Sequence, residues 1–83
     1  MLKAEVYITL KKTIADPQGL IIKHALESLG YGSVKEARVG KMVIVTLDTD
    51  DKKQAQKQLD QMCKKLLANP VIEDYRFVIT EAK

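Results

Sequence analysis

The feature that most constrains the fold is a change of hydrophobic period that occurs twice along this chain. Residues 2–10 alternate apolar and polar side chains, which is the two-residue period of a β-strand with one buried face. Asp16 and Pro17 then predict a helix start, because the Asp side chain accepts a free amide hydrogen bond and Pro has no amide to leave unpaired. Residues 17–29 carry an apolar stripe at helical spacing, and Gly30 is expected to end the helix.

The second half of the chain repeats this order with a weak internal similarity. Residues 34–39 and 42–48 are predicted strands joined by a tight turn at 40–41, and residues 72–80 are a fourth strand. With a second helix before the last strand, the order is β-α-β-β-α-β. We therefore expect one domain over residues 1–83, a ferredoxin-like α+β two-layer sandwich. Its four-stranded antiparallel sheet would carry both helices on one face.

The second helix is expected to begin at residues 49–51, where acidic side chains suit the positive end of the helix dipole, and to end at residues 69–70. Its apolar stripe predicts the contact with the sheet: Ala55, Leu59, Met62, Cys63 and Leu66. The other sheet face then needs water or a partner, and on the first strand it would carry Tyr7 and Thr9.

Size and charge narrow the function classes. A chain of 83 residues buries only about 60–65% of the surface that it exposes when unfolded. We therefore expect no deep cleft, and we expect the chain to gain stability by oligomerising. The 14 cations and 11 acids give a net charge of +3 and are interleaved, which argues against a nucleic-acid partner. No apolar run is long enough for a transmembrane helix, so no membrane partner is expected. The single cysteine is typical of a cytoplasmic protein.

The sequence contains no recognisable catalytic, cofactor-binding or metal-binding pattern. Cys63 falls on the apolar stripe of the second helix, where a buried and inert thiol is expected. Asp48, Asp50 and Asp51 cluster, but the glycine and glutamate of an EF-hand loop do not follow, so helix capping explains them. Walker A and GxGxxG loops are absent. We therefore predict no catalytic residue, no bound cofactor and no metal in this chain.

A small contact patch is predicted at the start of the first helix. Gly19 stands in the first helical turn, where glycine costs about 1 kcal/mol relative to alanine, so close approach of another chain, a ligand or the loop itself is expected there. Leu20 lies on the helix face opposite the apolar stripe, and His24 lies beside it one turn later. These three residues are candidates for contact with another molecule.

Three functional classes fit the predicted topology. The segment 6–10 resembles the shorter signature of RNA-recognition motifs, but residues 41–47 lack the aromatic side chains that would stack bases. The segment 16–20 resembles the start of ACT domains, which bind amino acids at subunit interfaces. The third class is an assembly subunit, which needs surface and no reactive centre.

Five blocks of sequence favour the third class. They are residues 6–11, 16–19, 39–41, 62–69 and 71–76, in this order and at short spacings. Together they resemble the PurS subunit family of phosphoribosylformylglycinamidine synthase over essentially the whole chain. The resemblance implies a non-catalytic accessory subunit of an ATP-dependent, amide-transferring ligase complex. That complex converts formylglycinamide ribonucleotide (FGAR) to formylglycinamidine ribonucleotide (FGAM) in de novo purine (IMP) biosynthesis.

The resemblance also implies partners. A glutaminase subunit would release ammonia from glutamine with its own cysteine, and a large synthetase subunit would bind ATP, Mg²⁺ and substrate. The small subunit would be a homodimer or a dimer of dimers that bridges these two. Candidate contact residues follow from the resembling blocks, from expected exposure and from the patch at the first helix: Gln18, Gly19, Leu20, His24, Arg38, Lys41, Tyr75 and Arg76.

Overall fold

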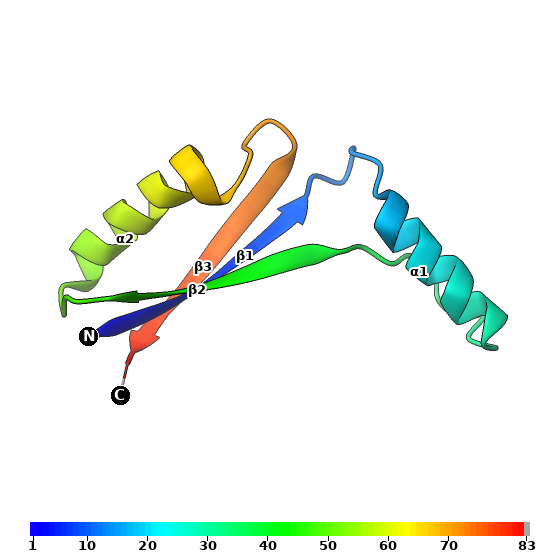
Figure 1. Cartoon of the computed structure of the whole chain (residues 1–83), viewed down its shortest axis with the longest axis horizontal. Coiled ribbons are helices and arrows are strands. Elements are labelled where there is room, and N and C mark those ends of the chain that lie inside the picture. Colours follow the sequence, from blue (N-terminus) through cyan, green and yellow to red (C-terminus); the bar gives the residue numbers. More distant parts are fainter. Residues whose placement is uncertain (83) are drawn as a thin grey trace.

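The computed structural model describes residues 1–82 and shows an α+β fold with an antiparallel sheet (Figure 1). The sheet consists of β1 (Leu2–Leu10), β2 (Gly40–Leu47) and β3 (Glu73–Glu81), in the order β2-β1-β3. The alternation in residues 2–10 is confirmed as a strand, which lies at the centre of the sheet. Its inward-facing side chains Leu2, Ala4, Val6 and Ile8 are at most 1% exposed. The strand predicted over residues 34–39 is absent, so the sheet of the described residues has three strands and not the four that were expected.

One face of the sheet is covered by α2 (Lys52–Met62) and its continuation η1 (Cys63–Leu67). The Asp51 side chain caps α2 by accepting hydrogen bonds from the backbone amides of Lys53 and Gln54. Leu59 and Cys63 are fully buried against β1, as the helical stripe predicts. The core of the molecule therefore lies between α2 and the sheet.

The end of this helix departs from the predicted register. η1 is a π-helical turn, in which the Ala68 backbone amide donates to the Cys63 carbonyl oxygen at 2.9 Å, five residues back. The wider turn rotates the following side chains, so that Leu67 packs against the core and Leu66 points outward, 82% exposed. The prediction that Leu66 belongs to the buried stripe is therefore wrong.

The first helix, α1 (Pro17–Ser28), stands away from the sheet instead of covering it (Figure 1). We call α1 together with the return segment 29–39 the α1 arm. Gly30 has a φ of +100° and turns the chain after the helix, as predicted. The arm makes the molecule 48 × 30 × 14 Å, with a radius of gyration of 16.2 Å, against about 12 Å for a compact chain of this length. The expected placement of both helices on one sheet face is therefore wrong.

Residues 34–39 are extended but pair with no strand of the sheet. They run back from the end of α1 and are held at the base of the arm by contacts with residues 11–19, which take the place of sheet hydrogen bonds. The predicted turn at 40–41 is also absent, because both residues already lie in β2. Gly40 is opposite Thr9, and a Cβ at Gly40 would lie 2.7 Å from the Ile8 carbonyl oxygen. Close strand approach explains this glycine.

Candidate subunit interface

The two chain segments that support the α1 arm are tied together at its base by Asp16. The Gly19 backbone amide donates to Oδ1 of Asp16 at 2.9 Å, and the Val39 backbone amide donates to Oδ2 at 2.7 Å. These bonds favour the charged carboxylate and hold the pKa of Asp16 below its ordinary value, with the Val39 bond contributing most. One side chain therefore caps α1 and joins the outgoing segment to the returning one.

Arg38 and Gly19 complete this tie. The Arg38 guanidinium donates to the backbone carbonyl oxygens of Lys11 at 2.9 Å and Ile14 at 3.0 Å. Gly19 is buried where the segments cross, and a Cβ there would lie 2.2 Å from the Ala37 carbonyl oxygen. Close approach within the chain thus explains why glycine occupies the first turn of the helix. These contacts join the outgoing and returning segments at the base of the arm.

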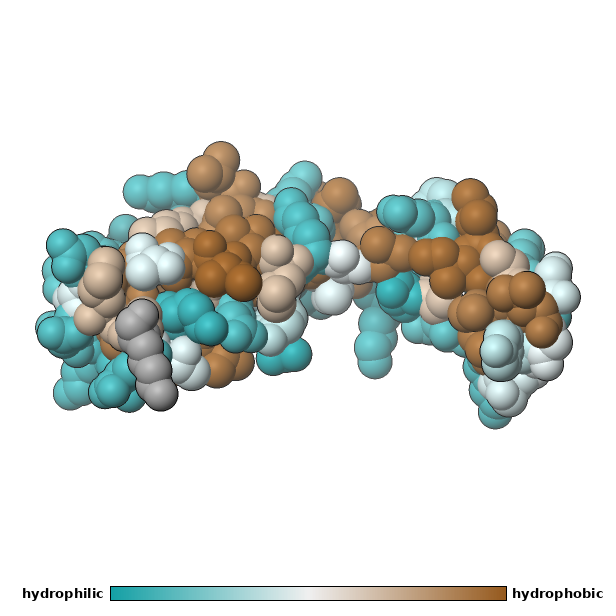
Figure 2. All heavy atoms as spheres, turned by 60° about the horizontal axis from the view of Figure 1, so that its bottom comes forward, coloured by the Kyte–Doolittle hydropathy of each residue, from teal (hydrophilic) through white to brown (hydrophobic). Residues whose placement is uncertain are grey.

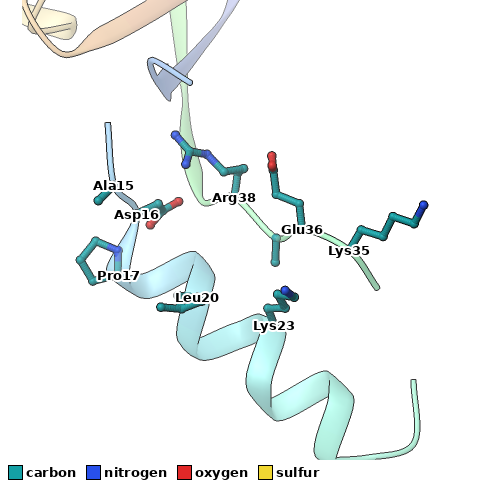
Figure 3. Close-up of a pocket in the computed structure, with 9 residues that line it drawn as sticks. Ala15, Asp16, Pro17, Leu20, Lys23, Lys35, Glu36 and Arg38 are labelled. Atoms are coloured by element: carbon teal, nitrogen blue, oxygen red, sulfur yellow. The ribbon is translucent and has the colours of Figure 1, made fainter. Parts of the chain in front are cut away.

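A surface hollow of about 380 Å³ lies between α1 and the return segment (Figure 3). Leu20 projects from the helix toward it and is 52% exposed, and Lys23, one turn along, lies on the same side. The residues that line the hollow come from both segments: Ala15, Asp16, Pro17, Leu20, Lys23, Lys35, Glu36, Ala37 and Arg38. The hollow has apolar walls and charged side chains at its rim. Such a lining is better suited to receive a side chain of another protein than to catalyse a reaction.

The apolar stripe of α1 faces solvent in the single chain. Ile21 is 68% exposed, Ile22 is 40% exposed and Leu29 is 73% exposed. Figure 2 shows apolar side chains gathered on the arm, apart from those of the sheet. A helix with such a stripe is ordinarily stabilised by covering it, so the arm offers a contact surface to another chain.

The sheet face opposite α2 is a second open surface. Tyr7 lies on it, its hydroxyl donating to Oε2 of Glu5 at 2.6 Å, and the Arg76 guanidinium lies 4.2 Å from the centre of its ring. This confirms that Tyr7 faces away from the core. Large apolar side chains are exposed on the same face: Met42, Ile44 and Val78.

The structure brings some of the predicted contact residues together. Gly19, Leu20 and Arg38 meet at the base of the arm. Gln18 and Lys41 line a neighbouring hollow of about 280 Å³ between the arm and the sheet. These five residues form one continuous region, which we call the arm base.

The other three predicted contact residues lie elsewhere. His24 is exposed on α1 and lines neither hollow of the arm. Arg76 is on the open sheet face, whereas Tyr75, its neighbour in β3, points toward α2. The Tyr75 hydroxyl donates to Oδ1 of Asp60 at 2.5 Å, and this bond raises the pKa of Tyr75 to about 12. Tyr75 thus links β3 to α2 within the chain.

Sequence reasoning missed the second role of Asp16. It identified Asp16 as a helix cap, but the bond to Val39 joins residues 23 positions apart and leaves no local pattern. Ala37 was missed for the same reason. The available signal was Gly19, because an otherwise costly glycine at the start of a helix indicates a close backbone approach.

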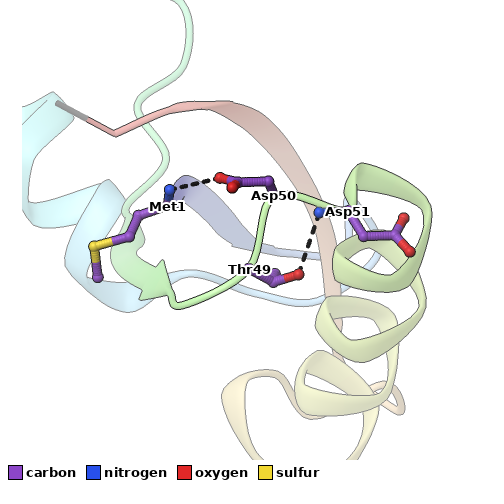
Figure 4. A network of polar contacts seen from close by, with 4 residues as sticks. All are labelled: Met1, Thr49, Asp50 and Asp51. Atoms are coloured by element: carbon purple, nitrogen blue, oxygen red, sulfur yellow. Dashed lines mark hydrogen bonds and ion pairs between the residues drawn. The ribbon is translucent and has the colours of Figure 1, made fainter.

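The acidic cluster before α2 has two explanations (Figure 4). Asp51 caps the helix, as predicted. The backbone amide of Asp51 itself donates a hydrogen bond to the Thr49 hydroxyl at 3.2 Å. Asp50 instead accepts a hydrogen bond from the amino group of Met1 at 2.7 Å, which lowers the pKa of its carboxyl group. Capping thus accounts for only part of the cluster.

Reactive groups are scarce in the described structure. Cys63 is buried, as predicted, and burial raises the pKa of its thiol, which makes it a poor nucleophile. Within residues 1–82, no three histidine, cysteine or acidic side chains come together in a way that could hold a metal ion. No helix of these residues is both long and apolar enough to cross a membrane.

Comparison with known proteins identifies relatives over almost the whole chain. The PurS family model, described as phosphoribosylformylglycinamidine (FGAM) synthase, matches residues 3–81. The synthase subunit PurS of Bacillus subtilis (strain 168) is 43% identical over 81 residues, which cover 98% of this chain and 95% of that protein. The subunit PurS of Methanocaldococcus jannaschii is 42% identical over 79 residues, covering 95% of each.

Solved structures agree with these relatives. The crystal structure of Methanocaldococcus jannaschii PurS superposes with a TM-score of 0.88 at 40% identity and covers 100% of both chains. A chain in a structure of PurLQS from Thermotoga maritima gives a TM-score of 0.84 at 26% identity, covering 96% of this chain and 99% of that one. The similarity therefore includes the arm as well as the sheet.

Proposed function

The chain belongs to the PurS family of phosphoribosylformylglycinamidine synthase, and from that premise we propose that it bridges the glutaminase and the ATP-dependent synthetase of this ligase complex. In this role it contributes surface and no reacting group to the glutamine-dependent conversion of FGAR to FGAM in purine biosynthesis. The synthetase subunit binds and uses ATP and Mg²⁺, and this chain binds neither. The ACT-like alternative rests on residues 16–20 alone, whereas the family match spans residues 3–81.

The observation that carries this proposal is the arm. A chain of 83 residues can bury only a small core. Even so, α1 and its apolar stripe stand away from the sheet, and hydrogen bonds from Arg38 and Val39 tie the two segments at the base of the arm. The open sheet face is a second surface in a different place. A molecule with two separate exposed apolar surfaces is suited to hold other proteins in register.

Self-association is part of the proposal. Covering the stripe of α1 with the arm or sheet of a second copy would bury the side chains that one chain leaves exposed, including Ile21 and Leu29. The complex would then contain a homodimer or a dimer of dimers of this chain. Its arm base (Gln18, Gly19, Leu20, Arg38 and Lys41), with His24, Tyr75 and Arg76, supplies the candidate contacts. We place the assembly in the cytoplasm, in keeping with the single unpaired cysteine.

Bridging would act through position. Ammonia released into bulk water is diluted and protonated before it meets a second enzyme. Two active sites held against one another give it a short enclosed path and a high effective concentration. The bridging subunit therefore raises the glutamine-dependent rate without touching either reaction.

The test is to measure FGAM synthesis by the two catalytic subunits with and without this chain, using either glutamine or ammonium chloride as the nitrogen source. We expect the glutamine-dependent rate to fall on omission while the ammonia-dependent rate changes little. Equal glutamine-dependent rates in both mixtures would overturn the bridging role.

A further inference from the structure

The π-helical turn after α2 builds an exposed groove that the helical pattern does not predict. Because the turn moves Leu67 into the core position, Leu66 is exposed. It lines the same groove as Met62, which packs partly against the core. These two side chains form the apolar part of a groove of about 380 Å³, which we call the Leu66 groove. Its polar lining comes from the same helix: Gln58, Gln61 and Lys65. π-Turns of this kind are frequent at functional sites.

The helix that carries the groove also carries the excess charge of the chain. Residues 52–67 contain five lysines and one aspartate, for a net charge of 5 − 1 = +4. The whole chain has +3, so the remaining residues sum to 3 − 4 = −1. The lysines are exposed on α2 and its continuation: Lys52, Lys53, Lys57, Lys64 and Lys65. A partner for this surface is favoured when its own charge is negative.

We propose that the Leu66 groove, with the exposed lysines of residues 52–67, is the docking site for an acidic surface on one of the two catalytic subunits of the complex. That surface places an apolar side chain against Leu66 and Met62, a carboxylate against Lys65, which lines the groove, and further carboxylates toward the lysines exposed elsewhere on the helix. The inference rests on the proposed bridging role and deepens it by assigning one contact of the bridge to the outer side of α2.

A second copy of this chain is the wrong occupant for the groove. A symmetric dimer centred on this helix would set two segments of net charge +4 against one another, and they would repel. The apolar stripe of α1 and the open sheet face offer self-association surfaces without this repulsion. A nucleic acid also fits poorly, because the groove lacks arginine and aromatic side chains for phosphate forks and base stacking.

The experiment compares two variants of the full-length chain in binding to each catalytic subunit. The test variant carries Lys65→Glu and Leu66→Gln. The control carries Lys12→Glu and Val71→Gln, which likewise reverse one lysine and replace one exposed apolar side chain with Gln, at positions that do not line the groove. Because Leu66 is 82% exposed, both variants are expected to keep the far-ultraviolet circular dichroism and the sedimentation behaviour of the unaltered chain.

We expect the test variant to bind one catalytic subunit at least roughly tenfold more weakly, with the control unchanged. Added salt should weaken binding of the unaltered chain to that subunit more than it weakens binding of the test variant, because the variant has lost part of the charge attraction. Equal binding by both variants would overturn the inference, as would a test variant that failed only to self-associate or only to bind an RNA probe. If the unaltered chain bound neither subunit, the bridging role itself would fail, which is a different result.

Discussion

At the scale of single residues, position 19 requires glycine because a side chain there would collide with a backbone atom. A Cβ at this position would lie 2.2 Å from the Ala37 carbonyl oxygen, which cannot rotate aside as a side chain could. We expect Gly19→Ala to lower the free energy of unfolding by about 1–3 kcal/mol, measured by urea denaturation at fixed protein concentration. Gly32→Ala is the control, since nothing lies within 4 Å of the added methyl group, and it should change stability by less than about 0.5 kcal/mol. Equal losses would contradict the tight crossing at the arm base.

Asp16 makes the arm sensitive to acid. Its two amide bonds lower the pKa of the folded carboxyl group below the ordinary value of 3.8. The stabilisation is therefore present above the ordinary value and is lost as the pH falls through the folded pKa. Asp16→Asn removes this titration, because an amide keeps one acceptor oxygen at every pH. Thermal unfolding followed from neutral to strongly acidic pH should show a steeper acid loss in the unaltered chain than in the variant; parallel curves would rule out this role.

At the scale of elements, the π-turn at the end of α2 can be distinguished by mutation from a helix that continues in α-helical register. Leu67 packs against the core and Leu66 does not, whereas a continued α-helix would place Leu66 on the stripe of Leu59 and Cys63. We expect Leu67→Ala to cost about 1–2 kcal/mol in chemical denaturation, and Leu66→Ala less than about 0.5 kcal/mol. The reverse order of the two losses would show that the helix ends in α-helical register.

Most elements could be predicted because their signals are local. The alternation of residues 2–10 and the Asp caps at positions 16 and 51 act within a few residues, and each formed as expected. Residues 34–39 were misassigned because their extended form is ambiguous: the same pattern serves a sheet strand or a segment held by Asp16 and Arg38. The π-turn was missed because it depends on how the helix end fits the core.

At the scale of the whole molecule, the sequence pattern identifies apolar faces but not the chain that covers them. The apolar stripe predicted on α1 is largely exposed in the single chain, whereas a ferredoxin-like fold would bury it on its own sheet. In the structure it is carried away on the α1 arm, and the radius of gyration rises to 16.2 Å. The candidate contacts at Gly19, Leu20 and Arg38 could be chosen from sequence, whereas their meeting at the arm base required the return segment to be placed.

The exposed stripe predicts how self-association can be blocked without unfolding the sheet. Ile21 is 68% exposed in the single chain, so Ile21→Glu should leave the sheet intact while placing a charge in the contact that we propose between copies. Sedimentation equilibrium should show the unaltered chain as a dimer or larger and the variant shifted toward the 9.3 kDa monomer. Glu27→Lys, which changes the charge by two units on an exposed part of the same helix away from the stripe, should leave the oligomer unchanged. A variant at Ile21 that assembles normally would place the contact elsewhere.

The bridge itself is tested most directly by sedimentation velocity of the glutaminase and the synthetase, mixed in equal amounts with and without this chain. With the chain present, and with the substrates of both enzymes supplied, we predict a faster boundary that contains all three proteins. Without it, the two catalytic subunits should sediment as separate species. Co-sedimentation of the two enzymes to the same extent in its absence would contradict the account.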